Sequence, residues 1–183
     1  MLQGQRVRLR AVEASDLPAL HLFANDLGIE LAGGGNPPMP RPLDDVAATL
    51  VFPPSEAKNI IVFVIEVESK AIGQIVIHGL NECHGVHRKA EIGLYIGDRE
   101  FWGKGYGREA ILLMLDYGFS CWNLNRIWLR TAASNVRAIK CYTGVGFVEE
   151  GRLRSNEWYQ GAFNDTVVMG MLRTDWEALA PKG

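Results

Sequence analysis

Apolar and polar residues alternate along several short segments, which is the pattern of strands with one buried face. In residues 6–12, Val7, Leu9 and Ala11 alternate with three arginines. Residues 59–69 are apolar almost throughout, so we expect this strand in the centre of a sheet. The same criteria predict five further strands, at 71–80, 87–98, 124–133, 147–161 and 164–172, of which the last two form a hairpin.

Apolar residues at helical spacing lie between these strands. The first predicted helix covers 15–26, where Ser15 or Asp16 can cap the first turn and Pro18 lies within it. The remaining helices are predicted at 43–52, 106–120, 135–146 and 173–179, and residues 31–42 form a loop rich in Gly and Pro. Only the connections through 106–120 and 135–146 are long enough for parallel crossovers. The order of elements therefore predicts an α/β fold with a mixed sheet.

Composition limits the classes of protein that fit this pattern. The 183 residues, of which 48% are hydrophobic, suit one domain spanning 1–183. A formal net charge of −2 leaves no footprint for nucleic acid or for an anionic membrane. The three cysteines are far apart and odd in number, which argues against a disulfide framework, and no apolar run reaches the ~18 residues of a membrane span. We therefore expect a cytoplasmic protein with no nucleic-acid or membrane partner.

Three glycines, Gly103, Gly105 and Gly107, stand at alternate positions where the helix 106–120 is predicted to begin. The first N–H groups of a helix lack intrahelical partners and carry partial positive charge, so glycines there let a phosphate approach closely. Lys104 and Arg108 add charge to the same segment. A turn alone would need one glycine rather than three. The segment therefore predicts a phosphate or pyrophosphate site.

Two common nucleotide-binding patterns do not fit this segment. The loop G-x-x-x-x-G-K-[ST] is absent, and Arg108 stands where the third glycine of G-x-G-x-x-G would fall. A kinase-like use of the loop for ATP would also need a magnesium-binding carboxylate, and no recognisable one pairs with it.

The segment WGKGYG, Trp102 to Gly107, resembles the loop Q/R-x-x-G-x-G/A with which GNAT N-acetyltransferases bind acetyl-CoA. Trp102 replaces the usual Gln or Arg, a departure similar to the RimJ/RimL-like branch, the ribosomal-protein N-terminal acetyltransferases. Further segments resemble that branch at 7–20, 88–110, 124–154 and 172–179. The resemblance implies a GNAT-like α/β (α+β) fold: a mixed, mostly antiparallel central sheet of about seven strands, flanked by helices, whose splayed parallel strand pair binds acetyl-CoA. No metal is implied.

The resemblance also implies roles for individual residues. Backbone groups of the splayed strand would bind pantetheine, and amides from Gly103 to Arg108 would bind the pyrophosphate. Asn135 would hydrogen-bond pantetheine, and Tyr142 would protonate the leaving thiolate. Ala138 stands where some relatives have a serine, so that contact is absent. The implied cofactor-binding residues are Leu94, Tyr95, Ile96, Gly103, Lys104, Gly105, Tyr106, Gly107, Arg108 and Asn135.

Acetyl transfer needs an unprotonated amine. An α-amine is about one-tenth neutral at pH 7, whereas a lysine amine is neutral in only about one molecule in 2,500. A strand carboxylate acting directly or through water would suffice as base, and Glu91 is the first candidate, ahead of Asp98 and Glu100. The alternatives are a cross-strand ion pair for Glu91 and an aromatic packed on the sheet for Tyr142.

The leading functional hypothesis is transfer of an acetyl group to the N-terminal α-amine of a protein or peptide. The alternatives are a small amine acceptor (a polyamine, an antibiotic or an amino-acid derivative) and a non-catalytic acyl-CoA sensor. We expect a monomer or a homodimer, and a loop at 28–42 that covers the acceptor groove. Cys121 and Cys141 are expected in the core, and the motif CHGVH at 83–87 is read as a turn rather than a metal site.

Overall fold

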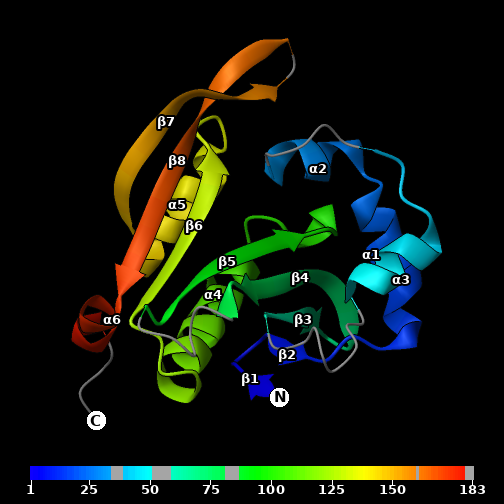
Figure 1. Ribbon diagram of the computed structural model, residues 1–183. Helices are drawn as coiled ribbons and strands as arrows, with labels where there is room; N and C mark the ends of the chain where they lie inside the picture. The colour runs from blue at the N-terminus through cyan, green and yellow to red at the C-terminus, as the bar shows by residue number, and fades with distance from the viewer. Residues whose placement is uncertain (34–38, 51–58, 81–86, 160, 180–183) are drawn as a thin grey trace.

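The computed structural model describes residues 1–33, 39–50, 59–80, 87–159 and 161–179. Its strands form an eight-stranded sheet in the order β1-β2-β3-β4-β5-β6-β8-β7, drawn in Figure 1. The strands are β1 (Leu2–Gln3), β2 (Arg8–Arg10), β3 (Ile60–Val67), β4 (Lys70–His78), β5 (Lys89–Ile96), β6 (Arg126–Ala132), β7 (Val148–Tyr159) and β8 (Ala162–Leu172). The helices are α1 (Leu17–Ala24), α2 (Leu27–Gly33), α3 (Leu43–Leu50), α4 (Tyr106–Asp116), α5 (Val136–Val145) and α6 (Arg173–Leu179).

The predicted mixed, mostly antiparallel sheet is confirmed, with three local differences. Strand β1 was not predicted, because two residues are too few to show a period. The predicted loop at 31–42 was wrong at its start, since α2 extends through Gly33, and residues 34–38 lie outside the described residues. Helix 106–120 is shorter than predicted: α4 ends at Asp116 and continues as a π turn, Tyr117–Cys121, which leaves Cys121 exposed rather than in the core.

Strands β5 and β6 are the parallel pair, and they stay together over only three residues. Glu91 is the last residue of β5 with a partner on β6, namely Trp128. Beyond it β5 continues along β4 as far as Ile96, while β6 continues along β8 as far as Ala132. The two strands therefore diverge, which is the predicted splay. On the β4 side the contact at Gly73 is so close that a Cβ there would collide with the Tyr95 carbonyl oxygen.

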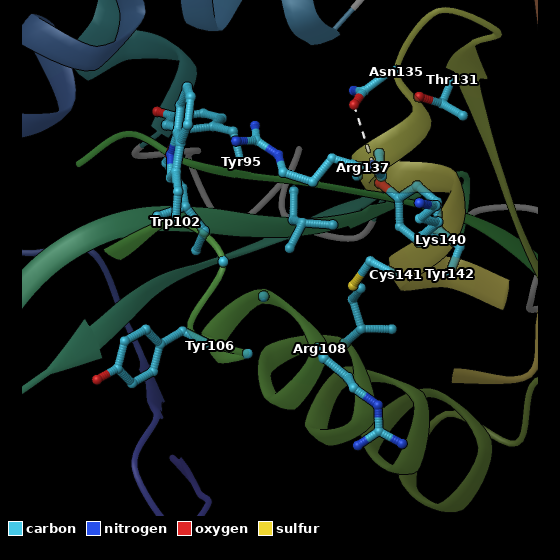
Figure 2. Close-up of a pocket in the computed structure, with 18 of the residues that line it drawn as sticks. Tyr95, Trp102, Tyr106, Arg108, Thr131, Asn135, Arg137, Lys140, Cys141 and Tyr142 are labelled. Carbon is cyan, nitrogen blue, oxygen red and sulfur yellow. Dashed lines mark hydrogen bonds between the residues drawn. The ribbon is translucent and has the colours of Figure 1, made fainter. Parts of the chain in front are cut away.

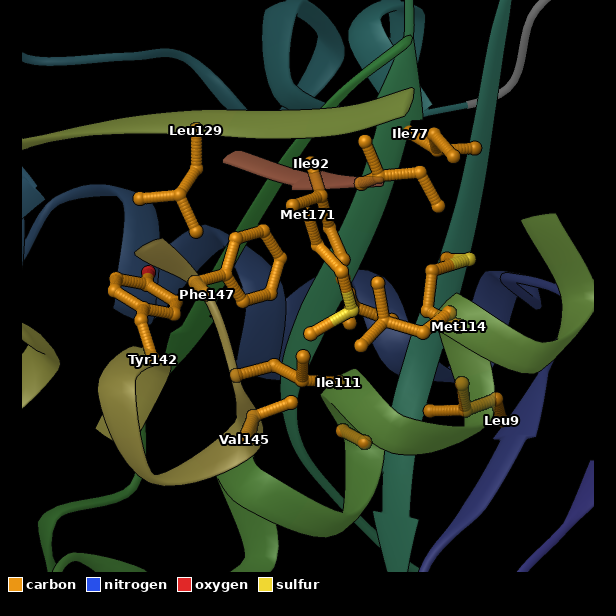
Figure 3. Close-up of a cluster of buried hydrophobic side chains, with 14 of the residues drawn as sticks. Leu9, Ile77, Ile92, Ile111, Met114, Leu129, Tyr142, Val145, Phe147 and Met171 are labelled. Atoms are coloured by element: carbon orange, nitrogen blue, oxygen red, sulfur yellow. The ribbon is translucent and has the colours of Figure 1, made fainter. Parts of the chain in front are cut away.

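Helices cover both faces of the sheet (Figure 1). On the face of α4 and α5, side chains from six strands and both helices form the main core, shown in Figure 3. Successive side chains of β3 point to opposite faces of the sheet. Phe63, Ile65 and Val67 therefore belong to this core, whereas Val64 is buried on the other face. Helices α1, α2 and α3 lie on the other side. None of the helices described is long and apolar enough to cross a membrane.

Candidate active site

A cavity of about 470 Å³ opens where β5 and β6 diverge. It is lined by the free end of β5, the segment from Phe101 to Arg108, the end of β6, α5 and one residue of α2 (Figure 2). Nine of the ten residues implied in cofactor binding lie on its wall, and the remaining one, Lys104, is not among the described lining residues. The cavity-lining members of that set are Leu94, Tyr95, Ile96, Gly103, Gly105, Tyr106, Gly107, Arg108 and Asn135.

The glycines of the loop have separate structural reasons. Gly103 has φ +72° and Gly105 has φ +87°, values that side-chain-bearing residues rarely adopt. Gly105 is the N-cap of α4, so the first helical N–H groups follow it directly. A Cβ at Gly103 would meet nothing within 4 Å, and one at Gly107 would make only ordinary contact with Leu94 Cδ1 at 3.5 Å. The backbone at the start of α4 thus faces open space that an anion can enter.

Arg6, from the N-terminal segment, braces this loop. Its Nη1 donates to the Lys104 carbonyl oxygen at 3.0 Å, and its guanidinium lies 4.9 Å from the centre of the Tyr106 ring. The backbone N–H groups of Arg6 and Val7 donate to Glu109 Oε1 at 2.8 and 3.0 Å. Sequence reasoning missed Arg6 because these contacts join residues about a hundred positions apart.

Trp102 lies beside the free end of β5. Its indole Nε1 donates to the Ile96 carbonyl oxygen at 2.7 Å, so this backbone acceptor is already engaged within the chain. The guanidinium of Arg137, from α5, lies 3.8 Å from the centre of the indole ring. Sequence reasoning also missed Arg137. The available signal was a cation in the first turn of a helix, where the helix dipole disfavours positive charge.

Tyr142 lies on the buried side of α5 at one end of the cavity and is 8% exposed. Its ring packs edge-on against Phe147 at a centroid distance of 5.9 Å. Burial raises the pKa of the Tyr142 phenol far above its usual value, so the hydroxyl keeps its proton even well above neutral pH. Asn135 begins the same helix, where its Oδ1 accepts from the Ala138 N–H at 3.2 Å.

Glu91 forms the cross-strand ion pair that was its alternative role. Its carboxylate accepts from Arg130 Nε at 3.0 Å and Nη2 at 3.4 Å, and His78 Nε2 lies 3.8 Å away. Arg130 lines the cavity, whereas Glu91 is not among the described lining residues. Glu91 is therefore held by Arg130, and the described cavity lining includes Arg130 and Tyr142 but not Glu91.

Charge in the cavity has one sign. The described lining residues include four basic side chains and no carboxylate: Arg108, Arg130, Arg137 and Lys140. Asp98 and Glu100, the weaker base candidates, are also absent from that lining, and Asp98 pairs with Lys70 Nζ at 2.6 Å. Such a cavity suits a ligand with several negative charges.

The cysteines and the metal alternative can be placed only in part. Cys141 lines the cavity, half-buried, and burial raises the pKa of its thiol. Residues 83–86 of the motif CHGVH lie outside the described residues. Across the described ranges, no group of three or more His, Cys, Asp or Glu side chains is arranged to hold a metal ion.

A family model described as the acetyltransferase (GNAT) domain matches residues 6–148. The chain belongs to the GNAT acetyltransferases. It is 31% identical to the spermidine N(1)-acetyltransferase of Vibrio cholerae over 94% of this chain and 96% of that protein. It is 35% identical to the putative ribosomal N-acetyltransferase YdaF of Bacillus subtilis and 36% identical to the uncharacterized N-acetyltransferase p20 of Bacillus licheniformis. Those two alignments span about half of each relative, 55% and 54%.

The fold of this acetyltransferase also matches a solved structure of the family. The spermidine N-acetyltransferase from Vibrio cholerae, in complex with CoA and spermine, superposes with a TM-score of 0.83 at 29% identity, covering 95% of this chain and 99% of that one. These matches support an N-acetyltransferase that uses acetyl-CoA and an amine acceptor. Assignment to the RimJ/RimL-like branch stays a prediction.

Proposed function

We propose that this acetyltransferase transfers the acetyl group of acetyl-CoA to a primary amine of a small polyamine, and that residues 1–183 are one catalytic domain. The observation that carries the proposal is the superposition, over nearly the whole of both chains, on an enzyme whose structure holds CoA and spermine. The spermidine N(1)-acetyltransferases of Vibrio cholerae and Escherichia coli align with 94% and 92% of the chain, which favours the small-amine alternative over a protein N-terminus.

The cofactor side follows from the glycine loop and the charge of the cavity. We propose that N–H groups at the start of α4, reached past Gly103, Gly105 and Gly107, bind the pyrophosphate, with Arg108 beside them. Backbone groups of Leu94 and Tyr95 on the splayed strand are proposed to bind pantetheine. When bound, acetyl-CoA supplies an acetyl group activated as a thioester.

Tyr142 is proposed as the acid. A leaving thiolate needs a proton, and the Tyr142 hydroxyl carries one at neutral pH, as an ordinary tyrosine does. Its place on the cavity wall, on the same helix as Asn135, supports delivery of that proton within the cavity.

A polyamine acceptor is protonated in a larger fraction of molecules than an α-amine, so it depends more on a base. An alkyl amine close to lysine in pKa is neutral in only about one molecule in 2,500 at pH 7, so a carboxylate that accepts the proton is needed. Glu91 remains the proposed base. Because Arg130 now holds its carboxylate, the incoming ammonium group has to displace Arg130 or reach Glu91 through water.

The test is thiol release from acetyl-CoA with a panel of spermidine, spermine, N-terminal peptides and aminoglycosides. We expect release with the polyamines, and a fall of about a hundredfold in kcat for Tyr142→Phe at unchanged CoA affinity. Tyr117→Phe is the matched control, since Tyr117 packs on Phe63 away from the described cavity lining. Release with peptides alone would restore the α-amine hypothesis. Binding of CoA without release for any acceptor would favour the sensor.

A further inference from the structure

Trp102 is the residue at which the cofactor loop departs from the usual pattern of its family, and the proposed chemistry does not use it. Two arginines contact its ring. The first contact is with Arg137 of α5, whose guanidinium lies 3.8 Å from the ring centre (Figure 2). The second contact is with Arg99, whose guanidinium lies 5.5 Å from the centre of the same indole.

Arg99 connects the indole to α2. Its Nη2 contacts both carboxylate oxygens of Asp26, at 2.7 and 3.0 Å. The same carboxylate accepts from the N–H groups of Gly28 and Ile29 at 2.8 and 3.1 Å and so caps the first turn of α2. Asp26, Arg99, Trp102 and Arg137 thus form a continuous chain of contacts, here called the Trp102 clasp.

Both ends of the Trp102 clasp reach the cavity. Arg137 and Trp102 line it directly, and α2 lines it through Ile29, which is 6% exposed. Glycine at position 28 is part of the arrangement, because a Cβ there would lie 2.6 Å from Arg99 Nη2. An anion that enters the cavity attracts Arg137, and every further member of the clasp is held by a charged or aromatic contact.

Stability alone does not account for this arrangement. The Arg99 side chain is 58% exposed, and an exposed ion pair of this kind adds little to folding free energy. The indole, in contrast, is anchored to the backbone of β5 by its N–H, which fixes the plane on which Arg137 rests.

We propose that Trp102 is a positioning residue that couples the cofactor cavity to α2. When CoA binds, it attracts Arg137, and the contacts through Trp102, Arg99 and Asp26 order the first turn of α2. Helix α2 contributes Ile29 to the cavity wall, whereas α4 contributes the start of the proposed phosphate site, so the coupling links two separate walls of the cavity. This inference concerns CoA binding, and its test does not depend on which amine is the acceptor.

The experiment is hydrogen–deuterium exchange of the full chain, read on peptides covering residues 24–33, with and without saturating CoA. In the unmodified protein we expect CoA to slow exchange of the Gly28 and Ile29 amides at least threefold. Trp102→Leu should remove this protection although CoA still binds, as checked by calorimetry. Trp102→Phe, which keeps an aromatic face, should retain at least half of it.

Arg137→Gln is the second variant, because Arg137 is exposed on α5 and its replacement spares the core. It should also abolish the protection of α2. Arg152→Gln removes an equally charged surface residue on β7 and should leave the protection unchanged. If CoA does not change exchange in α2, or if protection survives in Trp102→Leu and Arg137→Gln, the inference is overturned. Failure of polyamine acetylation with the protection intact would overturn only the proposed function.

Discussion

Gly107→Ala tests whether glycine is needed at the start of α4 for folding or for binding of CoA. Gly107 is the second residue of α4 and lines the cavity. A Cβ there would lie 3.5 Å from Leu94 Cδ1 and 3.9 Å from Ile96 Cγ1, which are ordinary van der Waals contacts. Alanine is favoured over glycine in a helix by up to about 1 kcal/mol. The substitution should therefore be neutral or stabilising for the free protein, by about 0 to 3 °C in Tm.

The effect on CoA should have the opposite sign. The added methyl group lies at the start of α4, where the N–H groups would otherwise meet the pyrophosphate, so we expect CoA affinity to fall about tenfold, or ~1.4 kcal/mol. At a CoA concentration of 100 Kd, the unmodified protein gains about 2.7 kcal/mol of stability, and the variant at the same concentration gains about 1.4 kcal/mol. The rise in Tm on adding CoA should therefore be about half as large in the variant.

Thermal melting with and without CoA, with Kd from calorimetry, measures both effects. Gly144→Ala is the matched control, because Gly144 lies in α5, is absent from the described cavity lining, and would place a Cβ in open space. It should leave Kd unchanged. Unchanged CoA affinity in Gly107→Ala would refute the proposed phosphate site, and a large loss of Tm without CoA would show that the fold itself needs glycine there.

Three further predictions concern other parts of the molecule. Arg130→Gln removes the cation that pairs with Glu91, an interaction worth at most about 1 kcal/mol. The free Glu91 carboxylate should then bind the substrate ammonium group more readily, so KM for spermidine should fall by about threefold. Steady-state kinetics that show an unchanged or higher KM would contradict the proposed base. Arg10, through its side-chain hydrogen bonds, lowers the pKa of the buried Asp16, so the stability from this pair is present above the usual Asp pKa and is lost as the pH falls through the lowered value. Asp16→Asn should cost about 3 kcal/mol at pH 7 and remove that acid-induced loss, as urea denaturation across pH would show. Trp158 is 60% exposed on the β7–β8 hairpin, so Trp158→Ser should change unfolding free energy by less than about 0.5 kcal/mol, and a larger loss in urea denaturation would argue against that exposure.

Much of the fold could be predicted because the information is local. The apolar run at residues 59–69 and the pattern at 71–80 depend only on neighbouring residues, and they place β3 and β4 within a few residues of their ends. Helix α2 was missed because glycine at positions 28 and 33 lowers helical propensity. The cap by Asp26 and the burial of Ile29 offset that cost. Strand β1 depends wholly on its pairing with β2 and leaves no periodic signal.

The candidate site divides in the same way. The role expected of Gly103, Gly105 and Gly107 could be predicted from the sequence, because a glycine-rich segment before a helix favours anion binding through neighbouring residues only. The contacts of Glu91 and Trp102 could not be predicted from the sequence. Arg130 neutralises Glu91 from a strand 39 positions away, and Trp102 meets an arginine from α5 and, through Arg99, an aspartate that caps α2.

The sequence by itself determined the α/β class, the order of most elements and the glycine-rich loop before α4, because periodicity, caps and glycine placement act over a few residues. The tertiary structure alone decided where β5 leaves β6, which cations line the opening and which carboxylate is held away from it. Those outcomes depend on charges and carbonyl groups from distant parts of the chain, and short sequence patterns do not predict contacts between residues that are far apart in the sequence.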